Sequence, residues 1–402
     1  MGKKETLSND TPNVTRVCFG ITKLGIGGAE RVLVDIANEL VEQYDTTIFT
    51  IYAGGEVEKE LNQKIKVVSI YNEEKKGKFI PIYILLCGKH IYNKFFKNKY
   101  DIEIAFLEGP ITRLFSYGRK KGKRKQGNRA IIKIAWVHND ITKVFGDSLK
   151  AGVKKYIDKD FYKKYDKIIF VSEHNKKVFE SFYGNISDRE VIYNYINKDR
   201  VLKESMHQKE IVPMEHAPKR NGSFRTFCTF LTVARLVKQK AIDRLIKVHK
   251  RLIDEGLEHK MYIIGDGEER ENLQELARKL RVTDTFIFLG KKENPYPYIR
   301  QADYFTLLSN YEGYGMVIEE AKILNKPIVI TDTAAKEAVR DYSRSLVIGN
   351  DEEKIYTELK NILLGKYEYL NKTNNHYNYD NRFLLEEIKQ ILKEVKKWNY
   401  PY

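Results

Sequence analysis

The stretch Asn310-Tyr-Glu-Gly-Tyr-Gly-Met-Val-Ile-Glu-Glu-Ala321 decides the fold of this chain. It places two acidic residues, Glu312 and Glu320, on either side of a glycine-broken loop that runs into a helix. Apolar segments precede it, at 304–308, and follow it, at 327–330. This order is typical of a β-α-β unit that carries a ligand loop at the carboxyl end of a strand.

The loop itself has the composition of an anion site. Its glycines, Gly313 and Gly315, let backbone N–H groups approach an anion closely. The helix that follows adds its own free N–H groups and the positive end of its dipole. Glu320, one or two turns into that helix, can accept hydrogen bonds from sugar or ribose hydroxyls. The stretch therefore indicates a site for a sugar nucleotide.

Length and composition set the frame for this site. A chain of 402 residues predicts two α/β domains. The net charge of +16 suits nucleic acid, an anionic membrane surface or phosphorylated substrates, and it also fits a general bias towards Lys, Asn, Ile and Tyr. The three cysteines, Cys18, Cys87 and Cys228, are too far apart for a metal site or a disulfide framework, and they fit a reducing compartment. No apolar run reaches the ~18 residues of a membrane-spanning helix.

Strands alternate with helices in two successive series. This pattern predicts an α/β fold of two Rossmann-like domains, with parallel sheets that face across a cleft. We expect a disordered start at 1–13, an N-terminal domain at 14–197, a linker at 198–224, a second domain at 225–375 and a C-terminal helical segment at 376–402. The strands are expected at 14–21, 46–52, 66–70, 102–107, 131–137, 167–172, 191–193, 226–233, 260–265, 285–289, 304–308 and 327–330.

A second glycine-rich turn, Gly25-Ile-Gly-Gly-Ala-Glu-Arg31, lies between the first strand and the first helix. At such a turn Gly27 and Gly28 bring backbone N–H groups up to a phosphate or an acceptor. The turn is not G-x-G-x-x-G and no acidic residue closes the second strand, so nicotinamide binding is disfavoured. The alternative is a plain tight turn between strand and helix.

Two further motifs follow strands of the second series. Arg235 and Lys240 come just after its first strand, where two long cations can clamp a diphosphate and stabilise the charge on a departing one. The alternative is a pair of solvated surface cations. Gly265-Asp-Gly267 forms a sharp turn after the next strand, and it can pack against a nucleobase.

The first domain carries a histidine and a basic region. His138, in Trp136-Val-His-Asn-Asp140, ends an apolar strand, where it can hydrogen-bond a sugar hydroxyl or orient an acceptor; the alternative is a core histidine satisfied by backbone. The run 119–125 suits either anionic lipid or a solvated loop. The Lys- and aromatic-rich segment 75–99 suits either a membrane-interface helix or a core-facing helix with snorkelling lysines.

Together these motifs, in this order, resemble those of the retaining glycosyltransferases of family 4, which have the GT-B fold. The resemblance covers nearly the whole chain after residue 13, and its most specific part is E-x7-E, present as Glu312 and Glu320. Val233-Ala-Arg-Leu-Val-Lys-Gln-Lys-Ala241 resembles the family's (G/A)-R-L-x3-K-G segment, and Gly265-Asp-Gly-Glu268 its G-D-G turn. The matching segments of the first domain are Gly27-Gly-Ala-Glu30, Trp136-Val-His-Asn139 and Val191-Ile-Tyr-Asn194.

The resemblance implies roles for the motif residues and no cofactor or metal. The first domain would bind the acceptor, the second would bind the donor, and the last helix would cross back onto the first. Two residues depart from the family's pattern, Ala241 for Gly and Tyr314 for the commoner Phe, and neither change removes a functional group. The implied roles are diphosphate binding by Arg235 and Lys240, phosphate binding by the N–H groups of Gly315, Met316 and Val317, and ribose binding by Glu320. Glu312 would contact the transferred sugar or the phosphate, and Gly27 and Gly28 would lie near the donor sugar and the acceptor, with His138 beside them.

The function expected from this resemblance is retaining transfer of a hexose or N-acetylhexosamine from a nucleotide sugar, with UDP as the expected nucleotide. The expected acceptor is a lipid-linked glycan in bacterial surface-polysaccharide synthesis, which places the enzyme in the cytoplasm and, through its basic surface, on the inner membrane face. One alternative is a glycosyltransferase that modifies a protein such as an adhesin. A nucleic-acid-binding protein is a remote alternative, because the basic residues lie in loops rather than along a reading helix.

Overall fold

The computed structural model describes residues 14–72, 80–96, 99–117, 131–139, 141, 158–207, 228–371 and 378–397. The chain divides into two compact units. The first contains the residues up to Tyr195 and those from Phe383 onward, and the second is Ile196–Arg382. The predicted disordered start at 1–13, the basic run 119–125, and the linker positions from 208 to 224 lie outside the described residues.

The first unit is built on a seven-stranded sheet in the order β3-β2-β1-β4-β5-β6-β7, and every neighbouring pair is parallel. Its strands are β1 (Arg16–Ile21), β2 (Asp45–Tyr52), β3 (Lys66–Tyr71), β4 (Ile102–Ala105), β5 (Ile132–Val137), β6 (Lys167–Phe170) and β7 (Asp188–Val191). Its helices are α1 (Gly28–Leu40), the 3-10 turn η1 (Glu58–Glu60), α2 (Ile80–Phe95), α3 (Pro110–Ser116), α6 (Glu173–Tyr183) and α13 (Arg382–Lys397).

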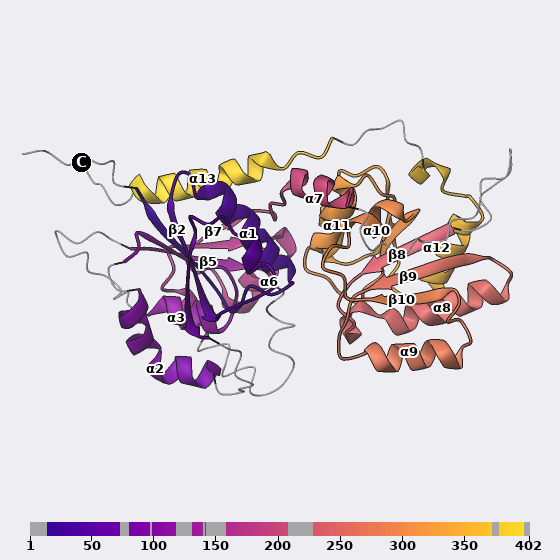
Figure 1. Cartoon of the computed structure of the whole chain (residues 1–402), viewed down its shortest axis with the longest axis horizontal. Helices are drawn as coiled ribbons and strands as arrows, with labels where there is room; N and C mark the ends of the chain where they lie inside the picture. Colours follow the sequence, from indigo (N-terminus) through magenta and orange to yellow (C-terminus); the bar gives the residue numbers. More distant parts are fainter. Residues whose placement is uncertain are drawn as a thin grey trace, which may run out of the picture. The chain divides into compact units, whose positions relative to one another are not determined.

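Helices cover both faces of this sheet. Helices α2, α3 and α6 pack against one face, and α1 and α13 against the other (Figure 1). Buried residues recur on α1 at Val32, Ile36 and Leu40, the spacing of one helix face. In α2, Ile84 and Ile91 enter the core while Leu86 is exposed, so one face of the described part of the Lys- and aromatic-rich segment packs on the core.

A buried ion pair crosses the core of the first unit. The Lys133 ammonium lies 2.9 Å from the Glu103 carboxylate on the neighbouring strand, and Tyr92 of α2 donates to the same carboxylate at 2.8 Å. Lys133 also donates to the carbonyl groups of Phe115 and Tyr117, at the end of α3. Burial raises the pKa of Glu103, and the adjacent Lys133 opposes that rise. Because every charge has partners, the pair fixes α2 and α3 on the sheet.

The second unit has a six-stranded parallel sheet in the order β10-β9-β8-β11-β12-β13. Its strands are β8 (Cys228–Val233), β9 (His259–Ile264), β10 (Phe286–Gly290), β11 (Tyr304–Leu307), β12 (Ile328–Thr331) and β13 (Ser345–Ile348). Its helices are α7 (Lys198–Ser205), α8 (Ile242–Asp254), α9 (Arg270–Lys279), α10 (Tyr296–Gln301), α11 (Met316–Ile323) and α12 (Glu352–Leu363), with 3-10 turns η2 (Lys238–Lys240), η3 (Ala334–Val339) and η4 (Glu368–Asn371).

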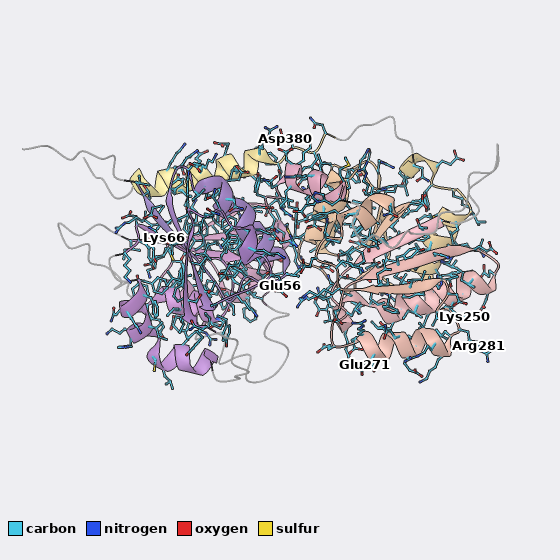
Figure 2. All side chains as sticks on the ribbon, viewed as in Figure 1. Glu56, Lys66, Lys250, Glu271, Arg281 and Asp380 are labelled. Carbon is cyan, nitrogen blue, oxygen red and sulfur yellow. The ribbon has the colours of Figure 1, made fainter. Side chains whose placement is uncertain are left out.

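Helices α8, α9 and α12 pack on one face of this sheet, and α7, α10 and α11 lie on the other (Figure 1). On α8, Leu245, Ile246 and Leu252 are buried against the sheet. The side chains of Glu271 and Arg281 point outward from the unit, whereas apolar side chains fill the space between helices and strands (Figure 2).

In three places the structure differs from the sequence prediction, and one of them is strand β13, which no predicted strand covers. The last strand of the first unit is β7, not 191–193, because an edge strand with Asp188 and Glu190 lacks apolar alternation and is held by ion pairs to Lys167. The predicted linker begins with helix α7, whose first turn is capped by the Asn197 side chain. Only Val201 and Ser205 of α7 are buried, so its apolar periodicity is weak.

Each sheet has one point at which the strand order reverses. In the second unit the chain passes from β8 to β9 and β10 on one side, then returns to build β11, β12 and β13 on the other. In the first unit the reversal falls between β1 and β4. Loops that follow the two strands at such a point run in opposite directions, and this leaves room for a ligand at the carboxyl edge.

The histidine pair in the second unit predicts acid sensitivity. His259 Nδ1 donates to the Leu257 carbonyl at 2.7 Å, so its Nε2 accepts from His249 Nδ1 at 2.8 Å, and Thr285 donates to His249 Nε2 at 2.8 Å. Burial lowers the pKa of His249 to about 2 and that of His259 to about 4, from an ordinary 6.5. Below pH 6.5 the unfolded chain therefore binds more protons than the folded chain. As the pH falls through this range, the free energy of unfolding decreases by about 1.4 kcal/mol per pH unit for each histidine.

Thermal unfolding at pH 7.5, 6.0 and 5.0 checks this effect. The unfolding midpoint should be constant above pH 7 and fall below pH 6.5. The double variant His249→Gln, His259→Gln should show a shallower fall over the same range, with the contribution of other groups retained. An equally steep fall in the variant would contradict the assignment.

Ala241, at the start of α8, has a left-handed backbone with φ 48° and ψ 37°. This conformation costs an L-residue roughly 1–2 kcal/mol, and glycine adopts it without that cost. Allowing for the larger entropy of an unfolded glycine, Ala241→Gly should raise the free energy of unfolding by about 1 kcal/mol or less. The control Ala277→Gly, inside α9, should lower it by ~1 kcal/mol. Urea unfolding of both variants checks the sign; a destabilising Ala241→Gly would count against this account.

Candidate active site

Two loops meet where the strand order of the second unit reverses. One follows β8 and carries Arg235 and Lys240, and the other follows β11 and carries Glu312. The Lys240 ammonium donates to the buried Glu312 carboxylate. Ser309 donates to the same carboxylate oxygen at 2.6 Å. The Lys240 contact joins the two loops, and the Ser309 contact orients Glu312 within its own loop.

Further hydrogen bonds to backbone groups hold the two loops together. The N–H of Asn310 donates to the Gln239 carbonyl at 2.9 Å, and the Gln239 side chain donates to the Tyr311 carbonyl at 2.9 Å. From the other side, the Asn350 side chain donates to the Asn310 carbonyl at 2.8 Å. The loop that contains Glu312 is thus fixed before any ligand binds, which favours preorganised binding.

Arg235 differs from Lys240 in its surroundings. Its guanidinium is exposed and has no ion-pair or hydrogen-bond partner among the described residues. Lys240, by contrast, is partly buried beside Glu312. The loop after β8 therefore carries two cations. Arg235 is exposed without a charged partner among the described residues, and the charge of Lys240 is partly balanced by Glu312.

The Gly265-Asp-Gly267 turn packs directly against the loop after β8. A Cβ on Gly265 would meet the Ala234 carbonyl oxygen at 1.8 Å, and one on Gly267 would meet the Leu236 carbonyl oxygen at 2.4 Å. The Leu236 N–H donates to the Asp266 carbonyl at 3.0 Å. Glycine is required here because two backbones touch, so the turn positions the segment around Arg235.

Helix α11 begins at the end of the loop that carries Glu312. Gly315 caps it with φ 77°, and the backbone of Gly315, Met316 and Val317 forms its start. The N–H groups of a first helical turn have no intrahelical acceptors, so they are available to an anion. Tyr314 anchors the glycine-flanked loop, because its hydroxyl donates to the buried Glu319 carboxylate at 2.8 Å.

The Glu320 carboxylate lies on α11 and is 7% exposed. The hydroxyl of Tyr296, on α10, donates to Glu320 Oε1 at 3.1 Å. Sequence patterns did not identify Tyr296, because it lies in a Pro- and Tyr-rich segment with no motif. Ser309 was missed for a similar reason, although its place directly after β11 was a usable signal.

The remaining predicted residues belong to the first unit. Gly27 is the N-cap of α1 and Gly28 its first residue. A Cβ on Gly27 would meet the Glu30 carboxylate at 2.0 Å, so this acidic side chain folds back to the helix N-terminus. Such a carboxylate stabilises the positive end of the helix.

His138 follows β5 and is held from both sides. Its backbone N–H donates to Glu108 Oε1 at 2.5 Å, and its carbonyl accepts from Asn175 Nδ2 at 3.3 Å. The imidazole lies 4.7 Å from the Phe106 ring, and its Nε2 is buried without a partner among the described residues. Burial lowers the pKa of His138 to about 3, so the ring is neutral near pH 7. A neutral ring with an unpartnered nitrogen can form a hydrogen bond with a hydroxyl group.

Glu108 contacts the predicted site residue His138, and sequence reasoning missed it. It follows β4, beside the reversal point of the first sheet, and accepts hydrogen bonds from the backbone of His138 and Asn139 and from the Asn139 side chain. Burial raises the pKa of Glu108, and these hydrogen bonds oppose the rise. An acidic residue before Gly109-Pro110 at a strand end was the available signal.

Nine of the predicted site residues therefore lie in the second unit, and the other three predicted site residues lie in the first. No group of three or more His, Cys, Asp or Glu side chains arranged to hold a metal occurs within the described ranges. None of the helices the structure describes is both long and apolar enough to cross a membrane. The second-unit residues are Arg235, Lys240, Gly265, Gly267, Glu312, Gly315, Met316, Val317 and Glu320, and the first-unit residues are Gly27, Gly28 and His138.

Known proteins resemble this chain in sequence or in fold. A Campylobacter jejuni N-acetylgalactosamine-N,N'-diacetylbacillosaminyl-diphospho-undecaprenol 4-alpha-N-acetylgalactosaminyltransferase is 25% identical over 85% of this chain and 88% of its own length. The C. jejuni GalNAc-alpha-(1->4)-GalNAc-alpha-(1->3)-diNAcBac-PP-undecaprenol alpha-1,4-N-acetyl-D-galactosaminyltransferase is 22% identical over 95% and 99%. The crystal structure of Anabaena HepE in complex with UDP and glucose superposes with a TM-score of 0.70 at 14% identity, covering 94% of this chain and 99% of that one.

Two family models account for most of the sequence. Residues 26–200 match the model described as Glycosyltransferase Family 4, and residues 214–380 match the one described as Glycosyl transferases group 1. Each match falls almost wholly within one of the two compact units. This chain is a glycosyltransferase and belongs to the family 4 glycosyltransferases with the GT-B fold.

Proposed function

We propose that this enzyme transfers a hexose or N-acetylhexosamine, with retention of configuration, from a UDP-sugar to a lipid-linked glycan in surface-polysaccharide synthesis. The observation that carries the proposal is the joined pair of loops with Lys240 on Glu312 and an unengaged Arg235 beside them. This arrangement suits a diphosphate. Support for the nucleotide comes from HepE, whose structure contains UDP, and support for the acceptor comes from the C. jejuni enzymes, whose names specify undecaprenol-linked glycans.

The proposed donor site binds the diphosphate mainly through electrostatic attraction. Arg235 and Lys240 neutralise the diphosphate, and the N–H groups of Gly315, Met316 and Val317 bind its oxygens. As the bond from the sugar carbon to the diphosphate breaks, negative charge grows on the leaving oxygen, and these groups stabilise it most at that moment. Lys240 then exchanges part of its contact with Glu312 for contact with the phosphate.

The two glutamates of the motif have different roles in this proposal. Glu320 accepts hydrogen bonds from the ribose hydroxyls, and Glu312 lies nearest to the sugar being moved. The acceptor oxygen forms its bond to the sugar carbon on the face that the diphosphate leaves. The acceptor hydroxyl gives its proton to the departing diphosphate, so neither glutamate is needed as a nucleophile. The proposal also includes no metal or other cofactor.

For the acceptor side we propose the first unit. Gly27 and Gly28 offer backbone N–H groups at the start of α1, and the neutral His138 ring hydrogen-bonds a sugar hydroxyl. The net charge of +16 favours work at an anionic inner membrane surface, where lipid-linked acceptors are found. The enzyme would then be a cytoplasmic protein bound peripherally to that surface.

A donor panel tests the function. Among UDP-, GDP- and ADP-sugars, a UDP-hexose or UDP-N-acetylhexosamine should raise the unfolding midpoint, because a ligand that binds the folded state stabilises it by mass action, by about 2.7 kcal/mol at 100 times Kd. EDTA should leave this shift and the turnover unchanged. Absence of binding and hydrolysis with every nucleotide sugar, with or without a lipid-linked acceptor, would overturn the proposal.

Substitution at the motif tests the site. Lys240→Ala and Glu320→Ala should each remove an interaction worth ~2–4 kcal/mol in the transition state, so kcat/KM should fall about 10²-fold or more. The matched control is Lys238→Ala, an exposed lysine on the same loop, which should keep nearly full activity. Turnover equal to the wild type in both site variants would rule out the assignment.

A further inference from the structure

Glu320 stands at the end of a hydrogen-bond chain that begins on another helix. Arg200, on α7, donates to the hydroxyl of Tyr296 at 3.1 Å. Tyr296, on α10, donates in turn to Glu320 Oε1 at 3.1 Å. The Arg200 guanidinium also lies 5.9 Å from the centre of the Tyr296 ring. Three helices of the second unit thus converge on one carboxylate.

The hydrogen bonds from Arg200 through Tyr296 to Glu320 are shielded from solvent and run in one direction. Tyr296 is 1% exposed and Glu320 is 7% exposed, so solvent does not compete strongly for their hydrogen bond. A phenol has one proton, and Arg200 can only donate, so the Tyr296 proton points at Glu320. A cation that donates to the phenol oxygen makes the phenol a stronger donor.

The contact restricts the carboxylate. A glutamate side chain has three rotatable bonds, and holding one of its oxygens against a buried hydroxyl selects a single orientation. When that orientation is also the one that accepts from a ligand, the entropy of ordering the side chain is removed before binding.

We propose that Tyr296, supported by Arg200, is a positioning residue that orients Glu320 toward the ribose of the donor nucleotide. This inference rests on the proposed function, in which Glu320 accepts from the ribose hydroxyls. In this proposal Tyr296 contacts neither the sugar nor the phosphates, so its contribution is the same in the ground state and in the transition state. Loss of the Tyr296 hydroxyl therefore raises KM for the donor and leaves kcat nearly unchanged.

The test uses Tyr296→Phe, which removes only the hydroxyl. Its control is Tyr298→Phe, the same change at another buried tyrosine of the same helix. Binding of UDP and of 2′,3′-dideoxy-UDP is measured by titration calorimetry for the wild type and both variants. GDP and ADP are measured with their dideoxy forms in the same way.

The wild type and Tyr298→Phe should bind the ribonucleotide about tenfold more tightly than the dideoxynucleotide. Tyr296→Phe should bind the two forms almost equally, since its Glu320 is no longer aimed at the missing hydroxyls. A general loss of packing would instead weaken both forms by the same factor. The variant Arg200→Gln, which keeps the Tyr296 hydroxyl and removes its cation, should lose part of the discrimination.

The outcomes separate this inference from the function on which it rests. If the wild type binds none of the three nucleoside diphosphates, the proposed function fails and the inference fails with it. If the wild type binds and discriminates, but Tyr296→Phe discriminates equally well, only the role of Tyr296 is overturned. A wild type that binds ribo- and dideoxynucleotides equally also overturns it, because Glu320 then does not contact ribose.

Discussion

The reversal of strand order between β8 and β11 is the constraint on which the donor site depends. Parallel strands place all their following loops at one edge, and only at this reversal do two adjacent loops run in opposite directions. The opening would admit water and let the loops drift apart if nothing joined them. Lys240 and the Asn310 backbone join them through Glu312 and Gln239, so Lys240 and the loop that leads into α11 keep fixed positions.

Helix α11 carries buried carboxylates whose burial is offset by hydrogen bonds. Two consecutive carboxylates, Glu319 and Glu320, are buried on it, which is costly unless each is hydrogen-bonded. Each receives a tyrosine hydroxyl, from Tyr314 and Tyr296 respectively. Tyr314 stands where the family more often has Phe, and its hydroxyl ties the glycine-flanked loop to the helix that follows. These contacts fix orientation, which matters more to a binding site than the small net stability they add.

Sequence patterns located the motif and most strands, because buried parallel strands are continuous apolar runs and the E-x7-E spacing is local. They did not predict β13. They also failed at β7, where ion pairs to Lys167 replace apolar alternation, and at α7, where few residues are buried. They also missed Tyr296 and Glu108, whose partners lie 24 and 30 positions away along the chain. Gly265 and Gly267 were expected to face a nucleobase; the structure adds a different requirement, since the backbone at Ala234 and Leu236 fills the space of a side chain.

The amino-acid order by itself determined the α/β class, the two series of strands and the residue types at each strand end, because these follow from local periodicity and turn chemistry. Only the tertiary structure decided which of those residues work together. The pairing of Lys240 with Glu312 spans 72 positions, and the link from Arg200 through Tyr296 to Glu320 spans three helices. Such pairings arise from strand order and helix packing, which bring together groups that no local pattern connects.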